Sequence, residues 1–120
     1  MQKINEKKLL RIFVSSTDRI SGELIHEKIV TMAKNQKLAG ATVFRGILGF
    51  GASSVIHTSK FWELTEKLPL VIEIIDQSEK VELFYKQIEP ILQKMPKGCL
   101  VTLDPVNVVL YKSGTKKDSY

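Results

Sequence analysis

Hydrophobic residues along this chain repeat with two different periods, which predicts a protein of mixed strands and helices. Short apolar runs rich in β-branched residues predict strands at 9–14, 41–47 and 70–75, with further strand-like runs after residue 98. Two intervening segments have apolar residues three and four positions apart, as expected for amphipathic helices. The predicted order is therefore strand, helix, strand, followed by a second unit of the same kind.

The first helix is predicted between the turn-like segment 15–18 and the glycine at position 40. Ser21 is the expected N-cap, and Gly40 is the expected stop signal. The predicted buried face consists of Leu24, Ile25, Ile29, Met32 and Ala33.

The second helix has the clearest hydrophobic periodicity in the chain. Asp76 is followed three residues later by Glu79, which is the spacing of a capping box. Pro90 lies inside the apolar stripe and predicts a kink or a break, because proline lacks a backbone N–H. The stripe consists of Val81, Phe84, Tyr85, Ile88, Ile91, Leu92 and Met95.

The last strand-like runs, 99–103 and 106–111, are separated by Asp104 and Pro105. Proline there predicts an edge strand, a bulge or two short strands. Residues 55–62 are compatible with either a strand or an irregular segment. Together these elements fit a ferredoxin-like βαββαβ plait, an α+β fold with an antiparallel four-stranded sheet and two helices on one face.

The strand at 70–75 is apolar on both faces, because Leu70, Ile72 and Ile74 alternate with Val71 and Ile75. Two helices cover only one face of such a sheet, and a chain of 120 residues leaves no further layer for the other face. We therefore expect copies of the chain to associate through their sheets.

The positive charge of the chain is concentrated at its two ends. The formal net charge is +5, yet residues 1–8 hold three lysines against one glutamate, and residues 112–120 hold three lysines against one aspartate. The nearly neutral body, residues 9–111, is the expected folded domain between two basic tails, of which the C-terminal tail is expected to be flexible. No phosphate-tracking groove is indicated, so no nucleic-acid partner is expected.

Composition indicates an ordinary globular protein of one domain. Hydrophobic residues make up 43% of the chain, and no apolar run approaches the roughly 20 residues that a membrane-spanning helix needs. The charged N-terminus has no apolar signal core, and the single cysteine, Cys99, has no internal disulfide partner. A cytoplasmic location is therefore expected.

The segment 45–57 carries the main candidate ligand site. Three of the seven glycines lie in it, directly after a predicted strand, and glycine lets backbone N–H groups turn toward an anion. The spacing matches neither a P-loop nor a dinucleotide fingerprint, and a tight bend or subunit packing remains an equal alternative. The candidate ligand-binding residues are Arg45, Gly46, Gly49, Phe50, Gly51, Ser53, Ser54 and His57.

Other polar residues give no sign of catalysis. The two histidines, His26 and His57, fall in different elements, and no cluster of carboxylates or cysteines completes a metal-ligand set. Glu73 stands alone in an apolar strand and is expected to face a subunit seam or to pair with Arg45 or Lys60. No catalytic residue or metal site is predicted, no cofactor is identified, and we expect a protein that is not an enzyme.

Four segments, Leu9–Val14, Leu38–Ser54, Ile56–Thr58 and Leu68–Asp76, carry a resemblance to known proteins. They resemble an uncharacterised bacterial and archaeal family that is grouped with the nitrogen-regulatory PII-like signalling proteins, and the resemblance covers residues 8–111. It implies a ferredoxin-like subunit of a homotrimer, with the sheets facing inward and a role in signal transduction. Members also resemble proteins encoded beside fluoride exporters, which implies a membrane transporter or channel as a candidate partner.

The resemblance carries over only part of the PII ligand site. PII proteins bind adenine nucleotides between subunits through a Gly-Phe-Gly segment, a second glycine-rich loop and basic residues near the C-terminus. The chain is similar in Gly49-Phe50-Gly51, but it has only Pro96-Lys97-Gly98 after the second helix and no arginine in 106–110. The implied ligand is a small anionic or nucleotide-like effector, and ATP binding itself is not carried over.

The leading hypothesis is a PII-like regulator that binds such an effector at subunit interfaces and transmits its presence to a partner protein. One alternative is an RNA-binding plait, because Gly49-Phe50-Gly51 matches the centre of an RNP1 motif, although the flanking basic and aromatic residues are missing. The other alternative is a structural oligomer without a ligand.

Overall fold

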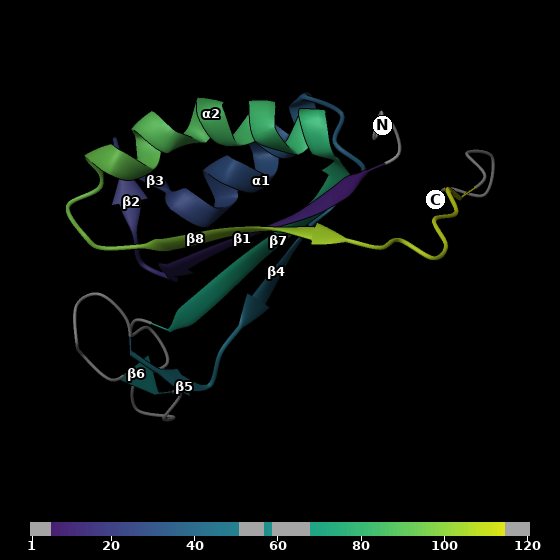
Figure 1. Cartoon of the computed structure of the whole chain (residues 1–120). Helices are drawn as coiled ribbons and strands as arrows, with labels where there is room; N and C mark the ends of the chain where they lie inside the picture. Colours follow the sequence, from purple (N-terminus) through teal and green to yellow (C-terminus); the bar gives the residue numbers. More distant parts are fainter. Residues whose placement is uncertain (1–5, 51–56, 59–67, 115–120) are drawn as a thin grey trace.

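The computed structural model describes residues 6–50, 57–58 and 68–114. In these residues a four-stranded antiparallel sheet is covered on one face by two helices (Figure 1), which confirms the predicted ferredoxin-like βαββαβ plait. The sheet order is β4-β7-β1-β8. Its strands are β1 (Lys7–Ser15), β4 (Ala41–Arg45), β7 (Pro69–Gln77) and β8 (Leu100–Val106), and the helices are α1 (Ile25–Asn35) and α2 (Ser78–Lys94).

Two short hairpins are added to this plan within the described residues. β2 (Arg19–Ile20) pairs with β3 (Glu23–Leu24) between β1 and α1. β5 (Leu48–Gly49) pairs with β6 (His57–Thr58) between β4 and β7. The β5–β6 hairpin lies on the side of the sheet opposite the helices (Figure 1).

The core lies between the helices and the inner face of the sheet. Directly opposed residues of an antiparallel pair share a face, so the register of β1 and β7 places Ile12 beside Ile72 and Leu10 beside Ile74. The core consists of Leu10, Ile12, Val14, Ile25, Ile29, Ala33, Leu70, Ile72, Ile74, Val81, Phe84, Ile88, Leu92 and Met95.

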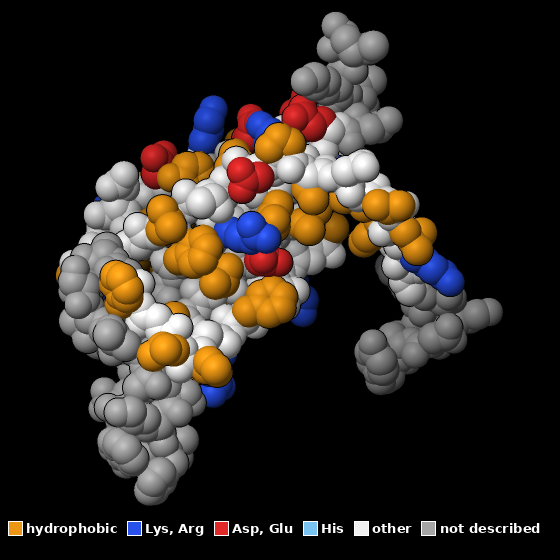
Figure 2. Space-filling model, turned by 60° about the horizontal axis from the view of Figure 1, so that its bottom comes forward, with side chains coloured by type: hydrophobic (Ala, Val, Ile, Leu, Met, Phe, Trp, Pro, Cys, Tyr) orange, Lys and Arg blue, Asp and Glu red, His pale blue; other side chains and the backbone are white. Residues whose placement is uncertain are grey.

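The outer face of the sheet, which we call the open face, has an apolar row that crosses all four strands. The register places Phe44 opposite Val71, Val71 opposite Phe13, and Phe13 opposite Leu100. Phe44, Phe13 and Leu100 are exposed. Figure 2 shows hydrophobic side chains gathered on this side around a basic and an acidic group. The prediction that the sheet is apolar on both faces is confirmed.

The ends of α1 differ from the prediction. Ser21 has a φ of 52° and lies in the two-residue turn between β2 and β3, so Leu24 takes the N-cap position without a side-chain hydrogen bond. The helix ends at Asn35, and Lys37, with a φ of 63°, adopts the left-handed conformation that is common just after a helix, three residues before the predicted stop at Gly40. The predicted cap and stop signal are therefore wrong, because a hairpin and an earlier tight turn intervene.

The capping box predicted at Asp76 is also wrong, because α2 begins at Ser78 and has no side-chain cap. Asp76 is buried, and its carboxylate accepts hydrogen bonds from the backbone N–H of Ala39, at 2.8 Å, and of Gln77, at 2.6 Å. This carboxylate therefore ties the turn before β4 to the start of α2.

Pro90 does not break α2, which continues as one helix to Lys94. Proline in a helix interior costs about 3 kcal/mol, whereas burying a large aliphatic side chain contributes about 1.5–3 kcal/mol. Ile88 and Leu92, on either side of Pro90, are both buried against the sheet. Packing of α2 on the sheet thus offsets the hydrogen bond that proline removes.

β8 runs through Asp104 and Pro105 as a single strand at the edge of the sheet, which is one of the predicted outcomes. The strand predicted at 106–111 does not form. Residues 107–114, which we call the C-terminal arm, leave the sheet without regular secondary structure (Figure 1). Val109 of the arm is 91% exposed.

At the N-terminal end of the described residues, β1 begins at Lys7, so two lysines of the predicted N-terminal tail, Lys7 and Lys8, lie in the sheet.

Candidate functional site

The segment 45–57, which we call the glycine segment, begins at the end of the edge strand β4. β4 ends at Arg45, and the chain then enters the β5–β6 hairpin, in which Gly49 pairs with His57. The structure therefore groups four of the predicted ligand-binding residues in one continuous segment and pairs the backbone of a fifth with it. The four are Arg45, Gly46, Gly49 and Phe50, the fifth is His57, and Gly51, Ser53 and Ser54 lie outside the described residues.

Gly46 fastens the start of this segment to β7. Its backbone N–H donates a 2.7 Å hydrogen bond to the carbonyl oxygen of Pro69. A Cβ atom at Gly46 would lie 2.9 Å from Cγ of Pro69, whereas a Cβ atom at Gly49 would lie 3.6 Å from the same atom. The ring of Pro69 therefore leaves no room for a side chain at position 46, whereas position 49 accepts a methyl group.

Replacing Gly46 by alanine is expected to destabilise the protein by about 1–3 kcal/mol, the usual cost of forcing extra atoms into a packed site. Gly49→Ala is the matched control, since its new methyl group makes ordinary van der Waals contact. Urea unfolding followed by circular dichroism measures both changes. Equal free energies of unfolding for the two variants would contradict this interpretation of Gly46.

Arg45 is exposed at the end of β4, opposite Leu70 of β7. Among the described residues it forms no ion pair and no hydrogen bond with another side chain. A surface ion pair, the structural alternative to ligand binding for Arg45, is therefore not found within this part of the chain. A guanidinium group in this position is free to pair with a phosphate or a carboxylate.

The residues that follow Arg45 present apolar side chains to solvent. Ile47, Leu48 and Phe50 are each more than half exposed, and they flank Gly49 in the hairpin. Exposed apolar groups gathered on a projecting segment are typical of protein interaction sites. The segment thus combines a cation at its base with an apolar tip.

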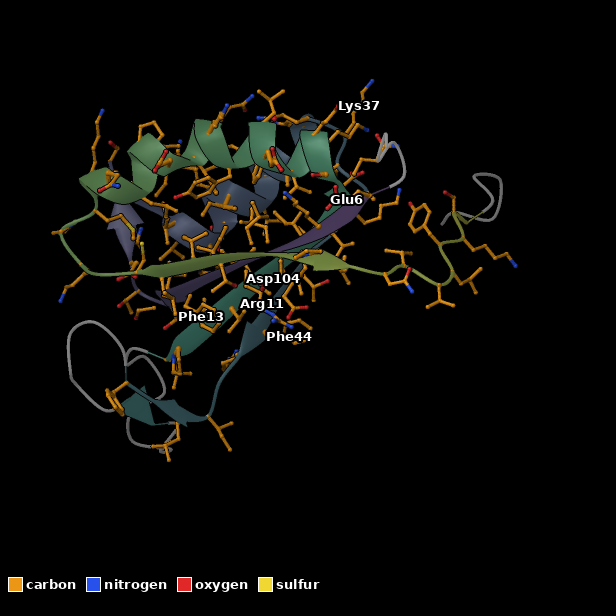
Figure 3. All side chains as sticks on the ribbon, in the orientation of Figure 1. Glu6, Arg11, Phe13, Lys37, Phe44 and Asp104 are labelled. Atoms are coloured by element: carbon orange, nitrogen blue, oxygen red, sulfur yellow. The ribbon has the colours of Figure 1, made fainter. Side chains whose placement is uncertain are left out.

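Glu73 pairs with Arg11, a partner that the sequence analysis missed. Arg11 Nε donates to Glu73 Oε2 at 2.9 Å, and the register of β1 and β7 places the two residues directly opposite. The predicted pairing with Arg45 is wrong, and Lys60 lies outside the described residues. Arg11, Phe13 and Phe44 all lie on the open face (Figure 3).

The single cysteine, Cys99, lies in an apolar environment. Cys99 packs against the core, and burial, together with the nearby Asp18 carboxylate, raises the pKa of its thiol. The thiol is therefore protonated at neutral pH and behaves as a small hydrophobic group. No three His, Cys, Asp or Glu side chains in the described ranges are grouped to hold a metal, and no helix there is long and apolar enough to cross a membrane.

Solved structures with a similar fold include a PII-like protein and a CutA1 protein. One is CPII, a nitrogen regulatory PII-like protein from Thiomonas intermedia K12, which was solved bound to ADP, AMP and bicarbonate. Its similarity to this chain has a TM-score of 0.60 at 14% sequence identity and covers 87% of this chain and 91% of CPII. The divalent ion tolerance protein CutA1 from Ehrlichia chaffeensis has a TM-score of 0.56 and 17% identity, covering 89% and 87%. The likeness defines the class of fold, which is the ferredoxin-like fold of a PII-like protein.

The family follows from sequence comparison. The DUF190 family model, described as an uncharacterized ACR, matches residues 7–108. A UPF0166 protein from Aquifex aeolicus (strain VF5) is 38% identical over 107 residues, covering 89% of this chain and 97% of the relative. Another, from Methanocaldococcus jannaschii, is 35% identical over 74 residues, covering 62% and 68%. The chain belongs to this DUF190 (UPF0166) family, which confirms the resemblance to an uncharacterised PII-like family.

Proposed function

We propose that this protein is a PII-like regulator that binds a small anionic or nucleotide-like effector at the glycine segment and transmits its presence to a partner protein. The observation that carries the proposal is the position of Arg45, an exposed cation at the end of an edge strand, where the chain enters a glycine-containing hairpin. Its charge has no ion-pair partner among the described residues. The similar fold of CPII, solved with ADP, AMP and bicarbonate, supports this class of ligand.

The proposed effector site lies at a boundary between copies of the chain. Phe44, the neighbour of Arg45 in β4, belongs to the apolar row of the open face. An exposed apolar row across a whole sheet favours association with a second copy, because burying it removes the row from water. The resemblance to PII-like proteins favours a homotrimer. In such an assembly the end of β4 lies at the rim of the buried face.

The proposed signal leaves through the β5–β6 hairpin. Ile47, Leu48 and Phe50 offer an apolar surface to a partner, and an anion held at Arg45 would order the base of the same segment. The candidate partner is a membrane transporter or channel, approached from the cytoplasm. The proposed role is binding and signalling without catalysis.

The proposal is tested by calorimetric titration of the protein with ADP, AMP, bicarbonate and fluoride, each added separately. At least one of them is expected to bind, and Arg45→Gln is expected to weaken that binding about tenfold or more, since a hydrogen bond to a charged group contributes about 1.5–3 kcal/mol. Lys34→Gln, which removes an exposed charge from the last turn of α1, is the control and should bind as the wild type does. Binding of none of the four ligands, or equal binding by Arg45→Gln, would contradict the proposal.

The open face argues against the RNA-binding alternative. An RNA-binding sheet needs cations for phosphates beside its aromatic side chains. Here Arg11 lies next to Phe13, but its charge is engaged by Glu73, and Asp104 of β8 adds a further negative charge on this face. Filter binding at moderate salt distinguishes the two functions, and we expect no retention of single-stranded RNA.

A further inference from the structure

A pocket lies at the opposite end of β4 from Arg45. Its volume is about 680 Å³, within the range of about 300–1,000 Å³ that is usual for sites of small molecules. Residues 37–42 form one wall, the ends of β1, β7 and α2 form another, and the C-terminal arm forms the third. None of the described residues of the glycine segment lines it.

Three lysines from three separate elements line this pocket. Lys7 comes from the start of β1, Lys37 from the turn after α1, and Lys80 from the first turn of α2. Figure 3 places Lys37 at the same end of the molecule as Glu6, the residue before β1. None of the three lysines has an ion pair or a side-chain hydrogen bond with a described residue.

Neither carboxylate in the lining forms an ion pair with these lysines. Glu73 is paired with Arg11, whereas Asp76, which accepts hydrogen bonds from the backbone N–H groups of Ala39 and Gln77, offsets one of the three positive charges. Three like charges on one pocket repel one another, and an anion bound among them would relieve this repulsion. The electrostatics of the pocket therefore favour a ligand with more than one negative charge.

The elements that carry two of the lysines are held in a fixed relation. Through its two oxygens, Asp76 binds the backbone at Ala39, two residues after Lys37, and at Gln77, three residues before Lys80. The backbone at Lys37 is itself left-handed, with a φ of 63°. One buried carboxylate thus anchors the backbone near both lysines before any ligand arrives, and such preorganisation of the backbone lowers the entropic cost of binding.

The other side of the pocket is apolar and aromatic. Ile75 of β7 contributes from the sheet, and Val108, Leu110 and Tyr111 contribute from the C-terminal arm. Leu110 and Tyr111 are otherwise largely exposed to solvent. A ring or aliphatic group of a ligand would cover these side chains, while its anionic group lies among the lysines.

We propose that this pocket is a binding site for a small organic phosphate, with the phosphate held by Lys7, Lys37 and Lys80 and an apolar or aromatic group packed against Ile75 and Tyr111. The site is separate from the glycine segment. It gives the C-terminal arm a function that the proposed regulatory role does not use.

The test is calorimetric titration with two probes, ADP and inorganic pyrophosphate, at low salt. The double variant Lys37→Gln/Lys80→Gln is expected to weaken the binding of both probes by about tenfold or more, because each lost lysine removes a charged hydrogen bond. Tyr111→Ala is expected to weaken ADP binding several-fold and to leave pyrophosphate binding unchanged. Lys94→Gln, at the far end of α2, is the matched control and should change neither.

The outcomes separate this proposal from the regulatory one. Binding of ADP that is lost in Arg45→Gln but retained in Lys37→Gln/Lys80→Gln supports the glycine segment and overturns the second site. Binding that is lost in the double variant and retained in Arg45→Gln supports the second site alone. The second site is also overturned if neither ADP nor pyrophosphate binds at about 1 mM, a concentration that corresponds to a binding free energy of about −4 kcal/mol. Amide chemical shifts that move at 37–41, 77–80 and 108–111 on addition of pyrophosphate would locate the ligand.

Discussion

Replacing Phe13 by aspartate is expected to convert an oligomer of this protein into monomers. Phe13 stands in β1, the second strand from the edge, and is the middle of the apolar row formed with Val71 and Leu100. It is 36% exposed in the isolated subunit, so the substitution leaves the core between sheet and helices intact. A carboxylate buried between two sheets without a partner costs several kcal/mol, and the substitution also removes the contribution of the Phe13 ring to the apolar row.

Sedimentation velocity at micromolar concentration measures this effect, and circular dichroism verifies that the variant is folded. Leu83→Asp is the matched control, because Leu83 is exposed on α2, on the opposite side of the molecule from the open face. The control should sediment as the wild type does. A wild-type protein that is monomeric under these conditions, or a Phe13→Asp variant that stays oligomeric, would contradict association through the open face.

The second large effect is expected on stability, from Phe84→Ala. The side chain of Phe84 is 1% exposed and packs between α2 and the sheet. Truncating a buried phenylalanine removes its transfer free energy and leaves a cavity, which together cost about 3–5 kcal/mol. Since a domain of this size is stabilised by about 5–15 kcal/mol in total, the variant should lose a large fraction of its free energy of unfolding.

Leu83→Ala is the control for this prediction, because the neighbouring residue on the same helix is 60% exposed. It should change the free energy of unfolding by no more than about 0.5 kcal/mol, as is usual at the surface. Urea unfolding at one fixed protein concentration keeps any contribution from association constant. Similar losses in the two variants would show that the face of α2 has been assigned incorrectly.

Local sequence patterns identified the main elements because each has one well-defined buried face. The stripe from Val81 to Met95 determines α2, and the alternation of Leu70, Ile72 and Ile74 determines β7 and its apolar outer face. The helix ends were predicted poorly. Ser21 has the right residue type for a cap, but the hairpin of β2 and β3 places it in a turn with positive φ instead. Caps depend on the path of the preceding backbone, which a residue type alone does not specify.

The polar contacts were even less accessible to sequence reasoning. The partner of Glu73 is Arg11, 62 positions away, because the register of β1 and β7 places them side by side. Asp76, predicted as a helix cap, instead joins the turn at Ala39 to the start of α2. Long-range pairs of this kind follow from strand register and turn geometry, which leave no periodic signal in the sequence.

The sequence by itself determined the plait, its two apolar sheet faces and the glycine segment, since hydrophobic periodicity and glycine positions are local properties of the chain. Only the tertiary structure decided that Gly46 is fastened to Pro69, that Arg45 has no ion pair within the described residues, and that three distant lysines line one pocket. The physical reason is that burial of one face imposes a hydrophobic period on each helix and strand, and that period can be seen in the sequence. A site forms where separate elements contact one another, and those contacts depend on the packing of the whole fold.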